Sequence, residues 1–185
     1  MTELLYLQNP NLFEIEAKIL NIIETENGTA IILDKTIFYV QGGGQPSDTG
    51  FITTTTNSFE VTKVIYNLDG EVYHLGHFTN GDFKIGDLAI LKVDQSKRQL
   101  HSKIHSAGHL IDLAIKNLGL DWLPIKGFHY PEGSYVEYSA ARQIDNLEHL
   151  KIQIQSQFDK SVAQKIPIII TFDNNQLCKA YHLER

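Results

Sequence analysis

The stretch FEIEAKILNIIETENGTAIIL, at residues 13–33, decides the fold of the first half of the chain. Its first residues alternate apolar and polar side chains, which is the period of a half-buried β-strand. Asn27-Gly28 is a strong turn signal before the apolar residues 29–33, so the sequence predicts a β-hairpin here. Residues 59–66 alternate again, and further turn signals follow at short intervals. Residues 1–93 are therefore predicted to form a small β-barrel or sandwich.

After residue 93 the pattern changes to that of amphipathic helices. Asp94 or Ser96 can cap a helix that ends at Gly119, and residues 146–163 predict a second helix. Strands are predicted at residues 134–139 and 166–172. We therefore expect an α+β chain with two domains, which are a β-rich domain at residues 1–93 and an α+β domain at residues 94–185.

The composition is that of an ordinary globular protein, with 42% hydrophobic and 21% charged residues among 185. No apolar run approaches the ~20 residues that span a bilayer, so we expect no membrane association. The first residues lack the pattern of a signal peptide, and a single cysteine fits a reducing compartment, so we expect a cytoplasmic protein. The net charge of −6 argues against binding a polyanion by bulk charge, although a local basic surface stays possible.

Histidines recur every fourth residue in the first predicted helix, at His101, His105 and His109. Residues four apart share one face of a helix, so two imidazoles can meet one ion; the alternative is a buried histidine with solvated neighbours. Cys178 and His182 also stand four residues apart. Because Zn²⁺ accepts imidazole and thiolate together, two histidines with this cysteine and histidine favour a zinc site.

A glycine-rich segment, TIFYVQGGGQPSDTG, occupies residues 36–50. No Gly-Lys-Ser/Thr follows the glycines, so the segment is not a phosphate-binding loop. Hydroxyl and amide side chains surround the bare backbone, and such a mixture suits recognition of a small polar group. The alternative is a flexible hairpin connection.

Taken in order, the motifs resemble those of alanyl-tRNA editing domains. They are Thr-x-Phe-Tyr-x-x-Gly-Gly-Gly-Gln-Pro-x-Asp-x-Gly, Asp-x-x-x-Arg, His-x-x-x-His-Leu and Cys-x-x-x-His. The chain resembles the free-standing AlaX-type editing proteins that keep the glycine-rich N-terminal domain. The resemblance implies a β-barrel-like domain followed by an α+β editing domain like that of threonyl- and alanyl-tRNA synthetases. It also implies hydrolysis of tRNA(Ala) mischarged with serine, and in some members with glycine.

The resemblance also assigns roles to residues of this chain. It implies that Thr36 and Gln45 act in catalysis, with Thr36 bonding a serine hydroxyl and Gln45 orienting the water or the ester. The implied Zn²⁺ ligands are His105, His109, Cys178 and His182, which leaves His101 outside the pattern. The implied substrate-binding residues are Gly42, Gly43, Gly44 and, for tRNA contact, Arg98.

Two local features leave alternatives open. Lys179-Ala180-Tyr181 replace the glycines that family members commonly carry between the last two metal ligands. This replacement keeps open the alternative of a tRNA-binding or regulatory module with the editing fold and lost turnover. A zinc hydrolase of small esters is a third interpretation. Phe128, His129 and Tyr130 either stack on the terminal adenine of tRNA or form a packed aromatic corner.

Overall fold

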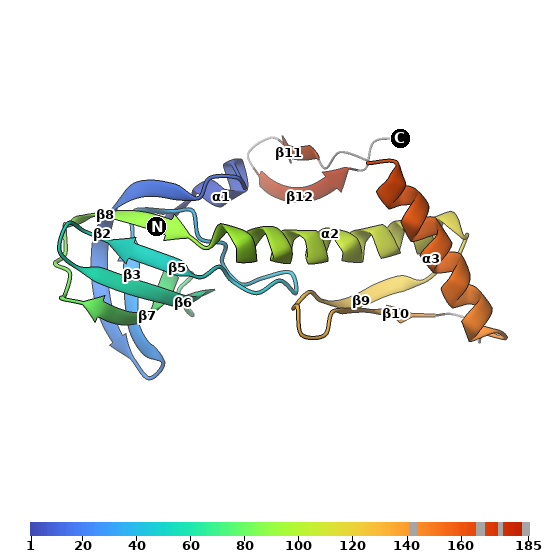
Figure 1. Cartoon of the computed structure of the whole chain (residues 1–185), viewed down its shortest axis with the longest axis horizontal. Helices are drawn as coiled ribbons and strands as arrows, with labels where there is room; N and C mark the ends of the chain where they lie inside the picture. Colours follow the sequence, from blue (N-terminus) through green and yellow to red (C-terminus); the bar gives the residue numbers. More distant parts are fainter. Residues whose placement is uncertain (141–143, 166–168, 174–175, 183–185) are drawn as a thin grey trace. The chain divides into compact units, whose positions relative to one another are not determined.

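The computed structural model describes residues 1–140, 144–165, 169–173 and 176–182, with the last two ranges described by their backbone (Figure 1). The chain divides into two compact units. The first comprises Met1–His105 with Gly127–Tyr135, and the second comprises Ser106–Lys126 with Val136–Arg185. The predicted boundary at 93/94 separates the strands of the first half from the helix that follows, whereas the two units divide inside that helix.

Six antiparallel strands within residues 1–140 close into a barrel, which confirms the barrel alternative for the β-rich half. The order around it is β2-β3-β7-β6-β5-β8, and β2 pairs with β8 to complete the ring. The first two strands are the predicted hairpin, in which Thr25 pairs with Gly28. The strands are β2 (Glu14–Thr25), β3 (Gly28–Leu33), β5 (Gly50–Thr53), β6 (Ser58–Tyr66), β7 (Val72–Asn80) and β8 (Leu88–Val93).

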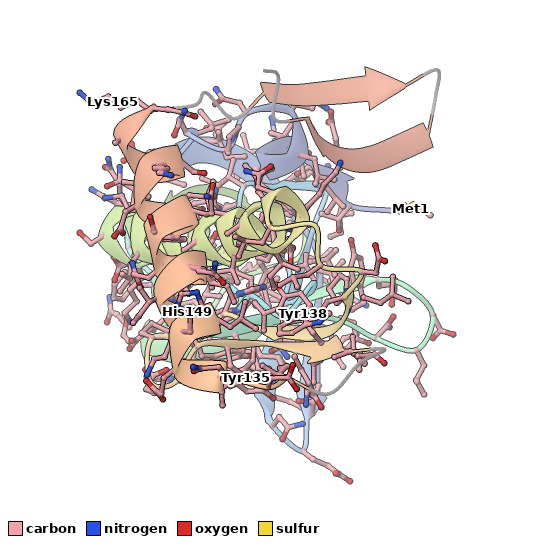
Figure 2. All side chains as sticks on the ribbon, turned by 90° about the vertical axis from the view of Figure 1, so that its right-hand side faces the viewer. Met1, Tyr135, Tyr138, His149 and Lys165 are labelled. Carbon is pink, nitrogen blue, oxygen red and sulfur yellow. The ribbon has the colours of Figure 1, made fainter. Side chains whose placement is uncertain are left out.

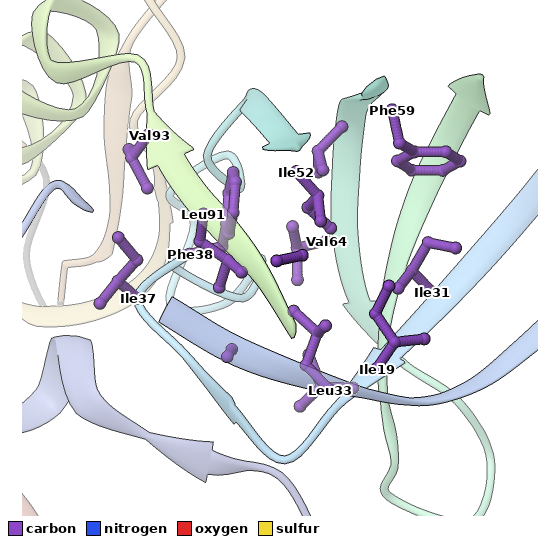
Figure 3. Close-up of a cluster of buried hydrophobic side chains, with 14 of the residues drawn as sticks. Ile19, Ile31, Leu33, Ile37, Phe38, Ile52, Phe59, Val64, Leu91 and Val93 are labelled. Carbon is purple, nitrogen blue, oxygen red and sulfur yellow. The ribbon is translucent and has the colours of Figure 1, made fainter. Parts of the chain in front are cut away.

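The barrel is filled by apolar side chains that its strands direct inward (Figure 3). In β8, for example, buried and exposed residues alternate strictly, as the period of a strand requires. Each fully buried aliphatic or aromatic side chain of this kind contributes about 1.5–3 kcal/mol relative to exposure. The largest fully buried apolar side chains are Phe38, Phe59, Ile19, Ile31, Leu33, Ile37, Ile52 and Leu91.

Short elements precede and follow the first hairpin. The strand β1 (Glu3–Leu4) leads into the one-turn helix α1 (Leu5–Gln8) and pairs in parallel with β4 (Lys35–Thr36). Thr36 is the last residue of β4 and the first residue of the glycine-rich segment.

The long helix α2 (Gln95–Asn117) follows β8 and has the ends that the sequence predicts. The Asp94 carboxylate accepts a hydrogen bond from the backbone N–H of Lys97 at 3.0 Å, which caps the first turn. Gly119, just after the last turn, has a φ of 70°, a left-handed conformation that favours glycine.

The remaining described elements are two pairs of strands and a further helix. The strands β9 (Leu123–Phe128) and β10 (Tyr135–Ser139) pair with each other, and β11 (Ile169–Asp173) pairs antiparallel with β12 (Gln176–His182). The helix α3 (Leu147–Ala163) begins at Asn146, whose side chain accepts from the backbone N–H of His149; Figure 2 shows His149 in this first turn. This arrangement confirms the α+β fold class. Among the described residues, no helix is long and apolar enough to cross a membrane.

Candidate active site

The three glycines lie in a tight turn. Gly42 and Gln45 exchange backbone hydrogen bonds of 3.3 and 3.0 Å across it. The two central residues, Gly43 and Gly44, have φ angles of 58° and 77°. Positive φ at both central positions is the signature of a type I′ turn, and glycine adopts it without steric cost.

The turn is packed against the segment that starts at Gly127. A Cβ added to Gly44 would lie 2.2 Å from the carbonyl oxygen of Gly127, so any larger residue would collide with backbone. The backbone N–H of His129 donates to the carbonyl of Gly44 at 2.8 Å. The segment is therefore not a flexible connection, because the turn is held by its own backbone hydrogen bonds and by the backbone of Gly127 and His129.

Gln45 holds the ring of His105. Its side-chain oxygen lies 2.9 Å from Nδ1 of His105, and only 4% of Gln45 and 9% of His105 are exposed. An amide oxygen can only accept a hydrogen bond, so the proton of the neutral imidazole sits on Nδ1 and the lone pair on Nε2. This is the tautomer in which a histidine binds a metal through Nε2.

His109, one turn further along α2, has a comparable arrangement in its own unit. Its Nδ1 lies 3.3 Å from a carboxylate oxygen of Asp112, and the other oxygen of Asp112 accepts a hydrogen bond from the Tyr138 hydroxyl. Burial, together with this hydrogen bond, raises the pKa of Tyr138 above its usual range, so the tyrosine stays a donor. Tyr138 lies on β10 together with Tyr135 (Figure 2). A carboxylate behind Nδ1 is the usual support of a metal-bound histidine.

The described half of the predicted zinc site therefore fits the ion. Both histidines have an acceptor at Nδ1, and both stand on one helix. Cys178 and His182 lie in β12, whose side chains are outside the described residues. A regular strand separates residues four apart by about 13 Å, so these two can share an ion only where the strand bends between them. Within the part of the chain described with side chains, no three His, Cys, Asp or Glu residues converge as a metal site. Ligation by all four residues stays a prediction.

Thr36, on β4, is buried with no exposed surface. Its hydroxyl lies 2.8 Å from Nε2 of His74 and accepts from the backbone N–H of Phe38 at 3.1 Å. Burial lowers the pKa of His74 to about 4, so the ring is neutral and Nδ1 donates to the carbonyl of Ile31 at 2.9 Å. The hydroxyl proton of Thr36 is consequently donated to His74. One lone pair of Thr36 Oγ1 stays available to accept a further hydrogen bond. Recognition of a serine hydroxyl by this lone pair stays a prediction.

Arg98 makes a buried ion pair with Asp48, whereas the family resemblance assigns it to tRNA contact. It is 3% exposed and Asp48 is 1% exposed. The guanidinium Nε lies 2.9 and 2.7 Å from the two carboxylate oxygens, and Nη2 also donates to Asp48. Nη1 donates to the carbonyl of Pro10 at 2.9 Å and Nη2 to that of Ile37 at 2.5 Å. Arg98 thus ties the start of α2 to the glycine-rich segment and is not presented to a tRNA.

The aromatic residues after Gly127 fit the packed corner better than the adenine platform. Phe128 stacks on Tyr130 at a centroid distance of 4.3 Å and on Tyr135 at 5.4 Å. His129 is 6% exposed, and its ring stacks on the ring of His105 at 4.5 Å with an interplanar angle of 16°.

Three residues that support the histidines are not predicted in that role from the sequence. His129 is predicted as part of an adenine platform or of a packed aromatic corner, and no role is predicted for Asp112 or Tyr138. For Asp112 a signal exists, because it follows His109 by three residues on the same helix face. His101 is also buried, at 8% exposure, and its Nδ1 has no hydrogen-bond partner among the described residues.

The first half of the chain is similar to a known family of synthetase domains. Residues 9–97 match the family described as tRNA synthetases class II (A). The match covers the barrel, the glycine turn and the first residues of α2.

Comparison with individual proteins places the chain more closely. It is 35% identical over 166 residues to the alanyl-tRNA editing protein AlaX-M of Pyrococcus horikoshii, which covers 88% of this chain and 70% of that protein. It is 29% identical over 172 residues to AlaX-L of the same organism, covering 92% of this chain and 41% of that protein. The chain belongs to the alanyl-tRNA editing protein family, as its motifs predicted.

Similarity extends to complete synthetases. The chain is 34% identical over 145 residues to alanine–tRNA ligase 1 of Lachnoclostridium phytofermentans, which covers 75% of this chain. It spans 16% of that ligase and 41% of AlaX-L, so it matches only part of these relatives.

Proposed function

We propose that this chain is a trans-editing hydrolase that deacylates mischarged tRNA(Ala), with seryl-tRNA(Ala) as the main substrate and glycyl-tRNA(Ala) as the second. The observation that carries the proposal is the buried hydrogen bond between Gln45 and His105, in a chain that belongs to the editing family. It joins the two motifs that the family resemblance assigns to the reaction and to the metal.

The reaction is hydrolysis of an ester. The oxygen of a water attacks the carbonyl carbon of the aminoacyl group, and the bond from that carbon to the ribose oxygen breaks. The water supplies a hydroxyl to the amino acid and a proton to the ribose oxygen. The ester is already reactive, so positioning the water and stabilising the developing oxyanion account for most of the rate.

Zn²⁺ held by His105, His109, Cys178 and His182 would have its four tetrahedral positions filled and would organise the pocket. It would supply Lewis-acid polarisation of a water or of the ester only where a ligand leaves or the shell expands. The chain's own residues position the reactants. Gln45 fixes the tautomer of His105. Gly43 is exposed, and its N–H is not used by the two hydrogen bonds of the turn, so it is our candidate donor to the ester carbonyl.

Thr36 is our candidate for discrimination between serine and alanine. A serine hydroxyl would donate to the remaining lone pair of Thr36 Oγ1, and alanine has no hydroxyl to make this bond. Thr36→Val should lower the preference for seryl- over alanyl-tRNA(Ala). An unchanged preference in a folded variant would remove Thr36 from this role.

The test of the function is a deacylation assay with seryl-, glycyl- and alanyl-tRNA(Ala), with and without a chelator. We expect hydrolysis of the first two, loss of activity on chelation and recovery with Zn²⁺. Gln45→Ala should lose activity, whereas Gln99→Ala, at an exposed position of α2, should keep it. No hydrolysis of any of the three tRNAs, together with retained tRNA binding, would instead establish the binding module.

Salt dependence separates the tRNA substrate from a small ester. Contacts to phosphates release counterions, so the affinity for a tRNA substrate should fall steeply as the salt concentration rises. Turnover of a minimal aminoacyl ester should change little over the same range. Equal salt dependence for both substrates would favour the small-ester hydrolase.

A further inference from the structure

His129 is held against the face of His105 by several features of the backbone. Its own N–H donates to the carbonyl of Gly44 at 2.8 Å, which fixes the start of the residue on the glycine turn. A Cβ on Gly127 would lie 2.6 Å from Nε2 of His129, so the ring uses the space that this glycine leaves. The result is a near-parallel stack on His105 at 4.5 Å, with both rings nine-tenths buried.

The stack and the Gln45 hydrogen bond restrain His105 in different ways. The hydrogen bond holds one atom, Nδ1, at 2.9 Å from Gln45. A ring held at a single edge atom can still pivot about that contact, and the pivot swings Nε2. A flat partner against the ring face blocks this pivot, and an aromatic contact is itself favourable. Together the two contacts fix both the tautomer and the plane of the imidazole.

We propose that His129 is a positioning residue for His105, acting through the flat face of its ring to aim Nε2 of His105 toward the zinc ion. The proposal rests on the proposed function, since the ion is part of it. His129 ligates nothing itself and transfers no proton in this role.

The first experiment compares zinc affinity, measured by competition with a chromogenic chelator, in His129→Leu and His129→Phe. Leu removes the flat face and should weaken zinc binding about two- to tenfold, the range of one aromatic pair. Phe keeps the face and should bind within about twofold of the unmodified protein. The visible spectrum of the Co²⁺-loaded protein should change in the Leu variant and be restored in the Phe variant. Phe128→Leu is the matched control, because that ring packs on Tyr130 and Tyr135.

The second experiment displaces the His129 ring without removing it. Gly127 does not have a left-handed φ, so Gly127→Ala is tolerated by its backbone, but the new Cβ requires the ring of His129 to move. This variant should weaken zinc binding as His129→Leu does, and adding it to His129→Leu should have no further effect. It also serves as the test if His129→Leu fails to fold.

Three outcomes would overturn the proposal. They are a His129→Leu variant that binds zinc as the unmodified protein does, a His129→Phe variant as weak as Leu, and a Phe128→Leu control as weak as His129→Leu. Failure of the proposed function is distinguishable from these. An unmodified protein that deacylates seryl-tRNA(Ala) without binding zinc would refute the zinc site itself, and the proposed role of His129 with it.

Discussion

The buried ion pair between Arg98 and Asp48 gives the sharpest test of how this chain is held together. Arg98→Met leaves the Asp48 carboxylate, which is 1% exposed, without its cation. Removing one partner of a buried pair typically costs about 3–5 kcal/mol. A domain of ordinary stability has about 5–15 kcal/mol in total, so the loss is a large part of it. For a chain of this size, the melting temperature should fall by roughly 10 °C.

The assay is urea unfolding of Arg98→Met, Asp48→Asn and the double variant. The double variant should lose less than the sum of the single losses, because it leaves no unpaired buried charge. Lys97→Ala is the control. Its ammonium group lies 3.9 Å from Asp94 and its side chain is 56% exposed, so the substitution should cost below about 1 kcal/mol.

A different result would return Arg98 to the role in tRNA contact. In that case Arg98→Met would be as stable as the unmodified protein, and the slope of tRNA affinity against salt would fall by about one contact. Together these two results would refute the conclusion that the buried Arg98 stabilises the fold through its pair with Asp48.

Three further predictions concern stability. Because the pKa of His74 is about 4 in the folded state and near 6.5 when unfolded, the unfolded chain binds the proton more readily between these values. Stability present above pH 6.5 should therefore fall by roughly 3 kcal/mol as the pH drops to 4, and urea unfolding of His74→Gln should show a flatter pH profile. Gly44→Ala should cost about 1–3 kcal/mol more than Gly70→Ala. Both glycines have positive φ, but the new Cβ on Gly44 meets backbone, whereas a Cβ on Gly70 meets nothing within 4 Å, so equal losses would contradict the packing. Asn146→Ala should lose about 1 kcal/mol through its helix cap, measurable as a lower urea midpoint.

Local signals predicted much of the fold. The turn at Asn27-Gly28, the cap at Asp94 and the stop at Gly119 each depend on a few neighbouring residues, and the structure has all three. Closure of the barrel could be anticipated only as a possibility. The pairing of β5 with β8 joins distant segments, and no short-range pattern specifies it.

The candidate site was harder to predict because its side chains are paired over long sequence distances. Arg98 has a charge and a place on a helix that suit a tRNA contact, but its partner Asp48 stands 50 residues earlier. Thr36 has the pattern of a strand residue, and its partner His74 lies 38 residues later. The glycines were predicted as open backbone to which a ligand could come close. Gly44 instead packs directly against the backbone of Gly127, which is possible only because glycine has no side chain.

Two of the long-range pairs that join α2 to the glycine-rich segment bear on how the chain can be divided. Arg98 and His105 lie in the first three turns of the helix, and their partners Asp48 and Gln45 lie in the glycine-rich segment before β5. A cut at residue 93 would give one fragment a buried carboxylate without its cation and the other a histidine without its orienting amide. The first three turns of α2 therefore depend on the glycine-rich segment for the partners of Arg98 and His105. Separate expression of the two halves would separate both pairs.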